Sequence, residues 1–213
     1  PIPAQDAQAR KIFLVGNPNV GKSVLFNALT GSYAVVSNYP GTTVEVSRGS
    51  AELDGGRVEI IDTPGMYSLR PITDEERVSR DILLSGEGTI VHVVDAKNLP
   101  RMLPLTLDLA MMGRPLVLAL NLMDEARSAG VRIDTASLSR ALGIPVVKLV
   151  ATKGEGLSDL RALLSVEPPP PAPPHVPFSA PVEGALESLA AMVPSGAGRF
   201  WALHLLEGDP AVA

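Results

Sequence analysis

The segment Gly16-Asn17-Pro18-Asn19-Val20-Gly21-Lys22-Ser23 limits the possible folds of this chain more than any other. It follows the apolar run Ile12–Val15 and precedes a helical pattern over Ser23–Leu29. A glycine-containing loop between a strand and a helix, ending in Lys-Ser, is the arrangement that holds a polyphosphate. Backbone N–H groups turn toward the phosphates, and the helix N-terminus adds its positive end. The segment therefore predicts an α/β fold organised around a phosphate-binding loop.

Two side chains of this loop have distinct expected roles. Lys22 is expected to reach the β- and γ-phosphates and to act in catalysis, and the Ser23 hydroxyl is expected to bind Mg²⁺. The remaining contacts are expected to come mainly from the backbone. The predicted nucleotide-binding residues here are Gly16, Asn17, Pro18, Asn19, Val20, Gly21, Lys22, Ser23 and Val24.

Short β-branched runs alternate with helical patterns from Lys11 to about Val166, which predicts a mostly parallel sheet with helices on both faces. The expected strands are Ile12–Val15, Val58–Ile61, Ile90–Val94, Leu116–Leu120 and Val146–Val150. The expected helices are Ser23–Leu29, Thr73–Leu84, Leu99–Met112, Thr135–Leu142 and Leu157–Leu164. The turn Asp54-Gly55-Gly56 predicts a hairpin between Val44–Leu53 and Arg57–Asp62, so one strand is expected to be antiparallel.

The composition divides the chain into four parts. Residues 1–10 are expected to be a flexible N-terminus, and 11–166 a single α/β domain. Residues 167–181 are proline-rich and predict an extended linker. Residues 182–213 show two short helical patterns, which form a short all-α appendage too small for a core of its own. These helices must either dock on the first domain or belong to a larger bundle.

The overall composition excludes several classes of protein. The net charge of −5 over 213 residues argues against a nucleic-acid-binding surface, which is usually basic. No run of eighteen apolar residues predicts a membrane-spanning helix, and no signal peptide is visible. The absence of cysteine excludes disulfides and thiolate metal sites, which fits a cytosolic setting.

A second motif, Asp62-Thr63-Pro64-Gly65, ends the second strand of the hairpin. It lies at the carboxyl edge of the sheet, where α/β proteins bind ligands. Asp62 is expected to hold Mg²⁺ through water, and the Gly65 N–H to contact the γ-phosphate and so act in catalysis. Its position about forty residues after the phosphate-binding loop makes this short motif informative.

A third motif, Asn121-Leu122-Met123-Asp124, follows the strand Leu116–Leu120. The Asp124 carboxylate can accept hydrogen bonds from N1–H and the 2-amino group of guanine, a pair that adenine lacks. Asn121 is expected to brace the neighbouring loops. Together with the first two motifs, this element predicts selection of GTP over ATP.

Two weaker signals complete the predicted site. In Gly41-Thr42-Thr43, one threonine hydroxyl is expected to bind Mg²⁺, and the chemistry does not decide between Thr42 and Thr43. In Val150-Ala151-Thr152-Lys153, which follows the last strand, the Ala151 N–H is expected to contact the guanine O6, and Val150, Ala151 and Thr152 are the predicted nucleotide-binding residues there.

With these motifs in chain order, the sequence resembles a GTPase family. The phosphate-binding loop, Pro40-Gly41-Thr42-Thr43 and Asp62-Thr63-Pro64-Gly65 look like the Era/EngA/MnmE class. More specific resemblance to the ferrous-iron transporter B (FeoB) family comes from Val44-Glu45, Met66–Leu69 followed by Asp74–Asp81, Val94–Leu99, Asn121–Ala126 and the tail Arg199–Asp209. The resemblance covers nearly the whole chain.

This resemblance implies a P-loop GTPase fold and a cytosolic domain of a bacterial Fe(II) transporter, at the cytoplasmic face of the inner membrane. The expected partners are GTP or GDP and a membrane-spanning domain of the same protein, with no nucleic acid. Residues 182–213 would then be part of a helical domain that is incomplete here. The resemblance assigns Mg²⁺ to Thr43 and a stimulating K⁺ to Asn19, and both residues are therefore expected to act in catalysis. Formation of a homo-oligomer is left open.

Two positions affect the expected activity. Met66 stands where many small GTPases carry a water-orienting glutamine, so hydrolysis is expected to be slow and to depend on Lys22, Mg²⁺ and K⁺. Val150 stands where the family usually has serine, which predicts weaker base affinity and faster GDP release.

Two alternative functions are weighed against transport. One is an Era/EngA-type RNA- or ribosome-associated GTPase, which would require a basic appendage. The other is a regulatory switch without transport. Iron is not expected to bind these residues, because no His, Asp or Glu cluster has ligand spacing.

Overall fold

A seven-stranded sheet forms the centre of the computed structural model, which describes residues 10–31, 34–171, 178–193 and 198–209. The strand order is β2-β3-β4-β1-β5-β6-β7. The strands are β1 (Arg10–Val15), β2 (Ala34–Asn38), β3 (Glu45–Leu53), β4 (Gly56–Asp62), β5 (Thr89–Asp95), β6 (Leu116–Asn121) and β7 (Val146–Lys148). Only β3 runs against the others, because it pairs antiparallel with both β2 and β4. The predicted hairpin and the single antiparallel strand are confirmed.

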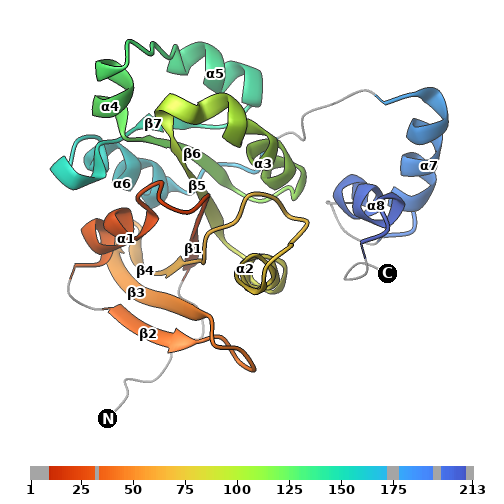
Figure 1. The fold of residues 1–213 in the computed structure, drawn as a ribbon, viewed down its shortest axis with the longest axis horizontal. Coiled ribbons are helices and arrows are strands. Elements are labelled where there is room, and N and C mark those ends of the chain that lie inside the picture. Colours follow the sequence, from red (N-terminus) through yellow and green to blue (C-terminus); the bar gives the residue numbers. More distant parts are fainter. Residues whose placement is uncertain (1–9, 32–33, 172–177, 194–197, 210–213) are drawn as a thin grey trace.

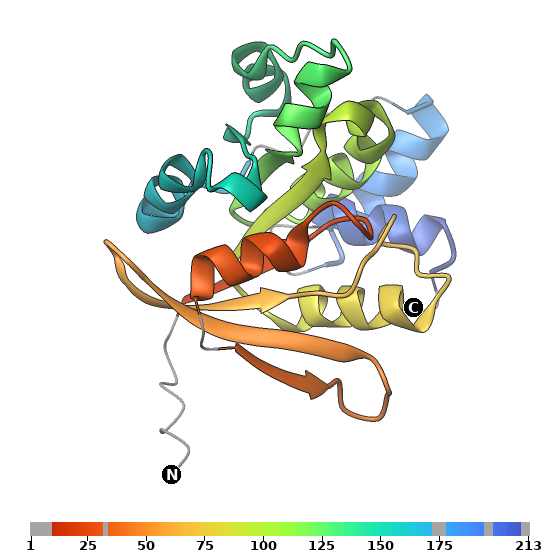
Figure 2. The same ribbon diagram turned by 60° about the vertical axis from the view of Figure 1, so that its left-hand side comes forward.

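Helices cover both faces of this sheet (Figures 1 and 2). On one face, Arg161 of α6 donates to the carbonyl oxygens of Ala28 and Leu29, which joins α6 to α1. On the other face, Arg114 donates to Leu83 O and so connects the start of β6 to α2. The helices are α1 (Lys22–Thr30), α2 (Asp74–Ser85), α3 (Leu99–Met111), α4 (Met123–Ser128), α5 (Thr135–Leu142), α6 (Leu157–Val166), α7 (Ala180–Ala190) and α8 (Gly198–Leu206), with short 3₁₀ turns η1 (Ala96–Asn98) and η2 (Ala151–Lys153). The predicted α/β fold is confirmed.

The central strands are buried on both sides, which explains their continuous apolar runs. Every residue of β5 and β6 is buried, and Ile12, Leu14 and Val15 of β1 have no exposed surface. The same burial keeps His92 of β5 neutral: desolvation, and the nearby charge of Lys22, lower its pKa to about 3. Its Nδ1 lies 3.0 Å from the Thr106 hydroxyl.

Three elements differ from the sequence predictions. β2 is missed because all five of its residues are exposed and its pattern does not alternate. α4 is missed because its six residues are too few for a helical period to stand out. β7 ends at Lys148, and not at Val150, because Val150 leaves the sheet to form a bridge with Glu155.

The expected chain ends and linker are only partly described. Of the predicted flexible terminus, Arg10 belongs to β1, and residues 1–9 lie outside the described residues. Residues 172–177 of the linker and the break at 194–196 also lie outside them. No helix within the described ranges is long and apolar enough to cross a membrane.

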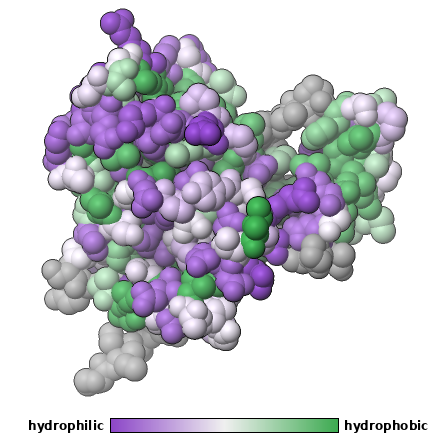
Figure 3. All heavy atoms as spheres, viewed as in Figure 1, coloured by the Kyte–Doolittle hydropathy of each residue, from purple (hydrophilic) through white to green (hydrophobic). Residues whose placement is uncertain are grey.

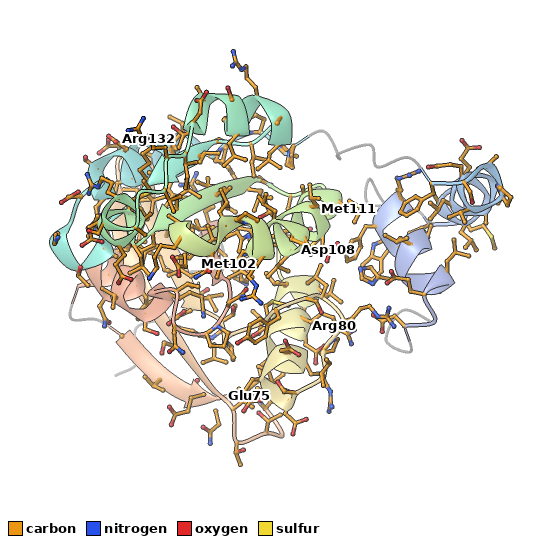
Figure 4. The ribbon with its side chains drawn as sticks, turned by 45° about the horizontal axis from the view of Figure 1, so that its top comes forward. Glu75, Arg80, Met102, Asp108, Met111 and Arg132 are labelled. Atoms are coloured by element: carbon orange, nitrogen blue, oxygen red, sulfur yellow. The ribbon has the colours of Figure 1, made fainter. Side chains whose placement is uncertain are left out.

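The two C-terminal helices contact each other, and α8 also docks on the α/β domain. Phe200 of α8 is 3% exposed and joins the main hydrophobic core, and Trp201 packs against that core. Asp209 accepts two hydrogen bonds from Arg80 of α2, at 2.8 and 3.1 Å, with both side chains buried. Figure 4 shows Arg80 and Asp108 directed toward α8, and Figure 3 shows the apolar surface of the α7–α8 pair. The sequence left open whether these helices dock on the α/β domain or belong to a larger bundle. In this structure α8 docks on the α/β domain.

Asp108 of α3 makes the contact between α8 and the α/β domain sensitive to pH. Burial, and the nearby charge of Glu207, raise the pKa of Asp108 to about 6. Because the folded pKa lies above the ordinary value, ionised Asp108 destabilises the fold above pH 6, and this penalty disappears as the pH falls toward 4. We expect Asp108→Asn to raise the free energy of unfolding by about 1–2 kcal/mol at pH 7.5 and by about a third of that at pH 4.5.

Urea unfolding at the two pH values measures this difference. The exposed Asp159→Asn on α6 is the matched control and should change stability little at either pH. An equal effect of Asp108→Asn at both pH values would contradict the prediction.

Candidate nucleotide site

The loop between β1 and α1 has the backbone geometry of an anion cradle. Gly16, Asn19 and Gly21 all have positive φ, at 153°, 63° and 87°. A Cβ on Gly16 would lie 2.1 Å from Val93 O, and one on Gly21 would lie 2.4 Å from Asn121 Nδ2. Glycine is therefore required at both positions, because a Cβ would clash with a neighbouring atom and because other residues rarely adopt these positive φ angles.

The backbone amides from Asn19 to Ser23 make no hydrogen bond to any described residue. They surround the start of α1, whose N-cap is Gly21, so they and the helix dipole can act together on an anion. Lys22 lies over the loop and donates from Nζ to Asn17 O at 3.2 Å. Burial lowers the pKa of Lys22, and Asp62 opposes that shift.

Ser23 and Asp62 meet beside this loop, although they lie on different elements. Ser23 Oγ donates to Asp62 Oδ2 at 2.8 Å. Asp62 Oδ1 is buried and makes no hydrogen bond within the described residues, and the same is true of Asn17 Oδ1. Burial raises the pKa of Asp62, while the Ser23 hydrogen bond and Lys22 oppose the rise. The Ser23 hydroxyl and the Asp62 carboxylate, whose Oδ1 makes no hydrogen bond within the described residues, offer the oxygen ligands that Mg²⁺ prefers.

The turn after β4 packs directly on the phosphate-binding loop. A Cβ on Gly65 would lie 2.6 Å from Pro18 Cγ, so no larger residue fits there. The Gly65 amide has no partner among the described residues, whereas the Met66 amide donates to Gly16 O at 3.1 Å. Thr63 Oγ1 donates to Leu14 O, and Pro64 O accepts from Ser79 of α2. The Met66 side chain is fully buried and belongs to the hydrophobic core.

The two candidate threonines differ in their contacts. Thr42 Oγ1 donates to Tyr39 O at 3.0 Å and accepts from the Val44 amide at 3.2 Å. Thr43 is exposed, and its hydroxyl makes no hydrogen bond within the described ranges. Gly41 precedes them with φ at 78°, a left-handed conformation that favours glycine. The hydroxyl of Thr42 is therefore committed to the local turn and that of Thr43 is available.

Asn121 joins three segments, as the sequence predicted. It is 1% exposed, donates from Nδ2 to Val20 O at 2.9 Å, and accepts from the Ala151 amide at 3.0 Å. This second bond corrects one expectation: in this structure the Ala151 N–H faces Asn121 and is not directed toward a base. Of the four amides from Ala151 to Gly154, only that of Thr152 has no partner among the described residues.

Asp124 lies at the start of α4, after Leu122, which adopts a left-handed conformation with φ at 58°, and the buried Met123. Its Oδ2 accepts from Lys153 Nζ at 2.8 Å. That hydrogen bond is the main cause of the lowered pKa of Asp124. The carboxylate is therefore held ionised as an acceptor, next to a hollow of about 530 Å³ that Lys97, Ser128 and Ala129 also line.

Comparison with known proteins identifies the relatives of this arrangement. The family model described as ferrous iron transport protein B matches residues 10–164. The chain belongs to the ferrous iron transport protein B family. The Fe(2+) transporter FeoB of Escherichia coli (strain K12) is 39% identical over 207 residues, which cover 93% of this chain and 27% of that protein. The Salmonella typhimurium FeoB is 38% identical over the same shares. The chain thus spans about a quarter of the length of these relatives.

Solved structures of the family have the same fold. The cytosolic domain of L. pneumophila FeoB gives a TM-score of 0.88 at 35% identity and covers 94% of this chain and 89% of that one. The T. maritima FeoB cytosolic domain in a GMPPNP form gives 0.86 at 34% identity, covering 95% and 83%. An S. thermophilus NFeoB mutant bound to GDP gives 0.84 at 37% identity, covering 96% and 81%.

The motifs alone did not reveal three residues that support this site. Lys153 is the last residue of the weak Val150–Lys153 signal, which assigned it no role, and it donates a hydrogen bond to Asp124. Ser79 holds the Pro64 carbonyl from α2. Glu76 of α2 accepts from the Tyr67 and Ile72 amides and so fixes the loop after Gly65. The capping box of Thr73 and Glu76 is visible in the sequence and could have indicated Glu76.

Proposed function

We propose that this chain binds GTP and hydrolyses it to GDP and phosphate, with residues 11–166 as the GTPase domain. The observation that carries the proposal is the row of unpaired amides from Asn19 to Ser23 beside the Ser23–Asp62 pair. Asp124 supplies the base selection at the other end of the site. The GDP-bound and GMPPNP forms among the related structures support the same conclusion.

In the reaction, a water oxygen forms a bond to the γ-phosphorus, and the bond from that phosphorus to the β–γ bridging oxygen breaks. GDP leaves with the electron pair, and the proton of the water passes to solvent. Lys22 and the loop amides lower the cost of the charge on the phosphate oxygens. The Gly65 amide contacts the γ-phosphate and reports its loss. Because Met66 is buried, no side chain at that position orients the water, and turnover is slow.

Mg²⁺ fits the donors of this site, and its bound form would neutralise phosphate charge. Ser23 and Thr43 would hold it directly through their hydroxyls, and Asp62 through water. The exposed hydroxyl of Thr43 supports its choice over Thr42, which is engaged in a turn. The direct test compares GTP and ATP hydrolysis by the purified chain, with Mg²⁺ and with EDTA. Equal rates for the two nucleotides would overturn the proposal.

We further propose that K⁺ binds beside Asn19 and stimulates hydrolysis. Asn19 is exposed, holds a left-handed backbone and makes no side-chain hydrogen bond within the described residues. We expect turnover in K⁺ to exceed that in Na⁺ by about 5- to 20-fold, because a monovalent cation there adds positive charge near the transferring phosphoryl group.

Asn19→Ala should remove most of that difference while GDP affinity stays within a few-fold. Asn27→Ala, on the exposed side of α1, is the matched control and should keep the full K⁺ effect. Rates measured by phosphate release in equimolar KCl and NaCl decide the question. Identical rates in the two salts for the unchanged chain would remove the K⁺ proposal.

We propose that the whole protein imports ferrous iron, with this region at the cytoplasmic face of the bacterial inner membrane. The family membership and the printed names of the curated relatives support this role. Residues 182–213 would belong to a helical domain that this chain contains only in part, joined by the 167–181 linker. The Era/EngA-type alternative has no support in the comparisons. Sequence following residue 213 in the native gene separates transport from a regulatory switch, because a transporter requires several membrane-spanning helices there.

A further inference from the structure

A second hollow lies behind α4 and separate from the nucleotide-facing surface. It encloses about 310 Å³, which is at the lower end of the size range of small-molecule sites. Its walls are apolar, formed by Met123, Val131, Ile133, Leu149 and Val150. Neither Asp124 nor Lys153 lines it, so α4 separates this hollow from the one beside the base-selecting carboxylate.

The rim of the hollow is cationic. It carries Arg127, Arg132 and Lys148 against one acid, Glu155. Arg127 pairs with Glu155 at 3.0 Å, whereas Arg132 and Lys148 form no ion pair with any described residue. Figure 4 shows Arg132 between α4 and α5, on the side of the molecule away from α7 and α8. Lys148 also lies near enough to Asp134 to help lower the pKa of that carboxyl, so the rim carries three cations against two acids and keeps a net positive charge over its apolar floor. This combination is complementary to an organic anion.

The walls of this hollow also support the two base-facing loops. The Met123 amide donates to Leu149 O at 3.2 Å, and the Met123 carbonyl accepts from Arg127 Nε at 3.2 Å. The Val150 amide donates to Glu155 O at 3.1 Å. Met123 and Val150 directly precede Asp124 and Ala151 in the chain. A molecule packed against their side chains would therefore restrict the movement of both loops.

We propose that the hollow behind α4 binds a small organic anion with an apolar body, and that its occupation slows release of the guanine nucleotide. The carboxylate or phosphate group of the ligand lies between Arg132 and Lys148, and its apolar body lies on Val131 and Ile133. The effect on nucleotide release rests on the proposed function, whereas binding of the anion does not.

The probe for binding is 4-fluorobenzoate, observed by ¹⁹F NMR with the nucleotide-free chain and with the GDP-loaded chain. Neutral 4-fluorobenzyl alcohol, of similar size, is the matched ligand control. We expect the anion to bind at least about tenfold more tightly than the alcohol. The double variant Arg132→Glu/Lys148→Glu should weaken anion binding at least about tenfold. Lys11→Glu/Arg101→Glu changes two exposed cations elsewhere and should leave binding within twofold.

Release of a fluorescent GDP analogue measures the coupling. A saturating concentration of 4-fluorobenzoate should slow release about three- to tenfold, and the rim double variant should not respond. Equal binding of the two probes, or binding unaffected by the rim variant, would overturn the site. Anion binding without a change in release would overturn the coupling. A chain that binds no GDP analogue at all would instead overturn the proposed function, and the ¹⁹F titration would still test the site.

Discussion

Replacing Asp124 with asparagine should weaken GTP binding by about 10²- to 10³-fold. In the proposed function the carboxylate accepts from two N–H groups of guanine, and hydrogen bonds to a charged acceptor are stronger than those between neutral groups. An asparagine amide would direct its own N–H groups at one of these donors, so that donor would lose its acceptor. The same variant should prefer xanthosine triphosphate, whose 2-oxo group accepts from the new amide. Equilibrium titration of both proteins with GTP and with xanthosine triphosphate measures the change.

Two control variants separate base recognition from the local charge. Glu125→Gln removes a neighbouring negative charge whose partner is Lys97, and should leave GTP affinity within about threefold. Lys153→Met removes the ion pair of Asp124 and leaves the Asp124 carboxylate in place to accept from the base. Its GTP affinity therefore measures the effect of the ion pair separately from that of the carboxylate. If Glu125→Gln lowered affinity as much as Asp124→Asn, the effect would be general electrostatics and Asp124 would have no specific role.

Replacing Arg80 with methionine should undock α8 from the α/β domain. The Arg80–Asp209 pair is buried on both sides, with side-chain exposures of 8% and 5%. Replacing Arg80 removes the two hydrogen bonds that it donates to the buried Asp209 carboxylate, and breaking a buried pair in this way costs about 3–5 kcal/mol. Trp201 is the only tryptophan of the chain and packs beside Phe200, at a ring-centroid distance of 5.1 Å. Its fluorescence emission should therefore shift to longer wavelength when α8 leaves the core.

A compensating variant makes this prediction specific. Arg80→Met combined with Asp209→Leu removes both charges and should recover most of the docking, because no buried charge remains unpaired. Asp74→Asn breaks an exposed pair with Arg77 on the same helix and should cost less than about 1 kcal/mol. An unchanged Trp201 spectrum in Arg80→Met would show that apolar packing alone holds α8.

The sequence motifs predicted to form the site lie together on the fold. The phosphate-binding loop, the Asp62–Gly65 turn and the Asn121–Asp124 segment all lie at one edge of the sheet, because each directly follows a parallel strand. Asn121 braces the neighbouring loops as expected. The elements that were missed, β2 and α4, are short and lack a clear period. The direction of the Ala151 amide was also missed, because it depends on a side chain thirty residues away.

The sequence by itself was sufficient to predict the local features of the candidate site: the residues of the proposed phosphate-binding loop, the carboxylate proposed to bind the base, and the glycines that the loop needs. These properties reside in segments of four to eight neighbouring residues, so backbone geometry and side-chain type are sufficient to predict them. The tertiary structure decided the pairings between distant residues. Examples are Lys153 with Asp124, the docking of Asp209 on Arg80, the burial of Met66, and the cationic hollow behind α4. Such contacts depend on how the sheet and its helices pack, which no local pattern encodes.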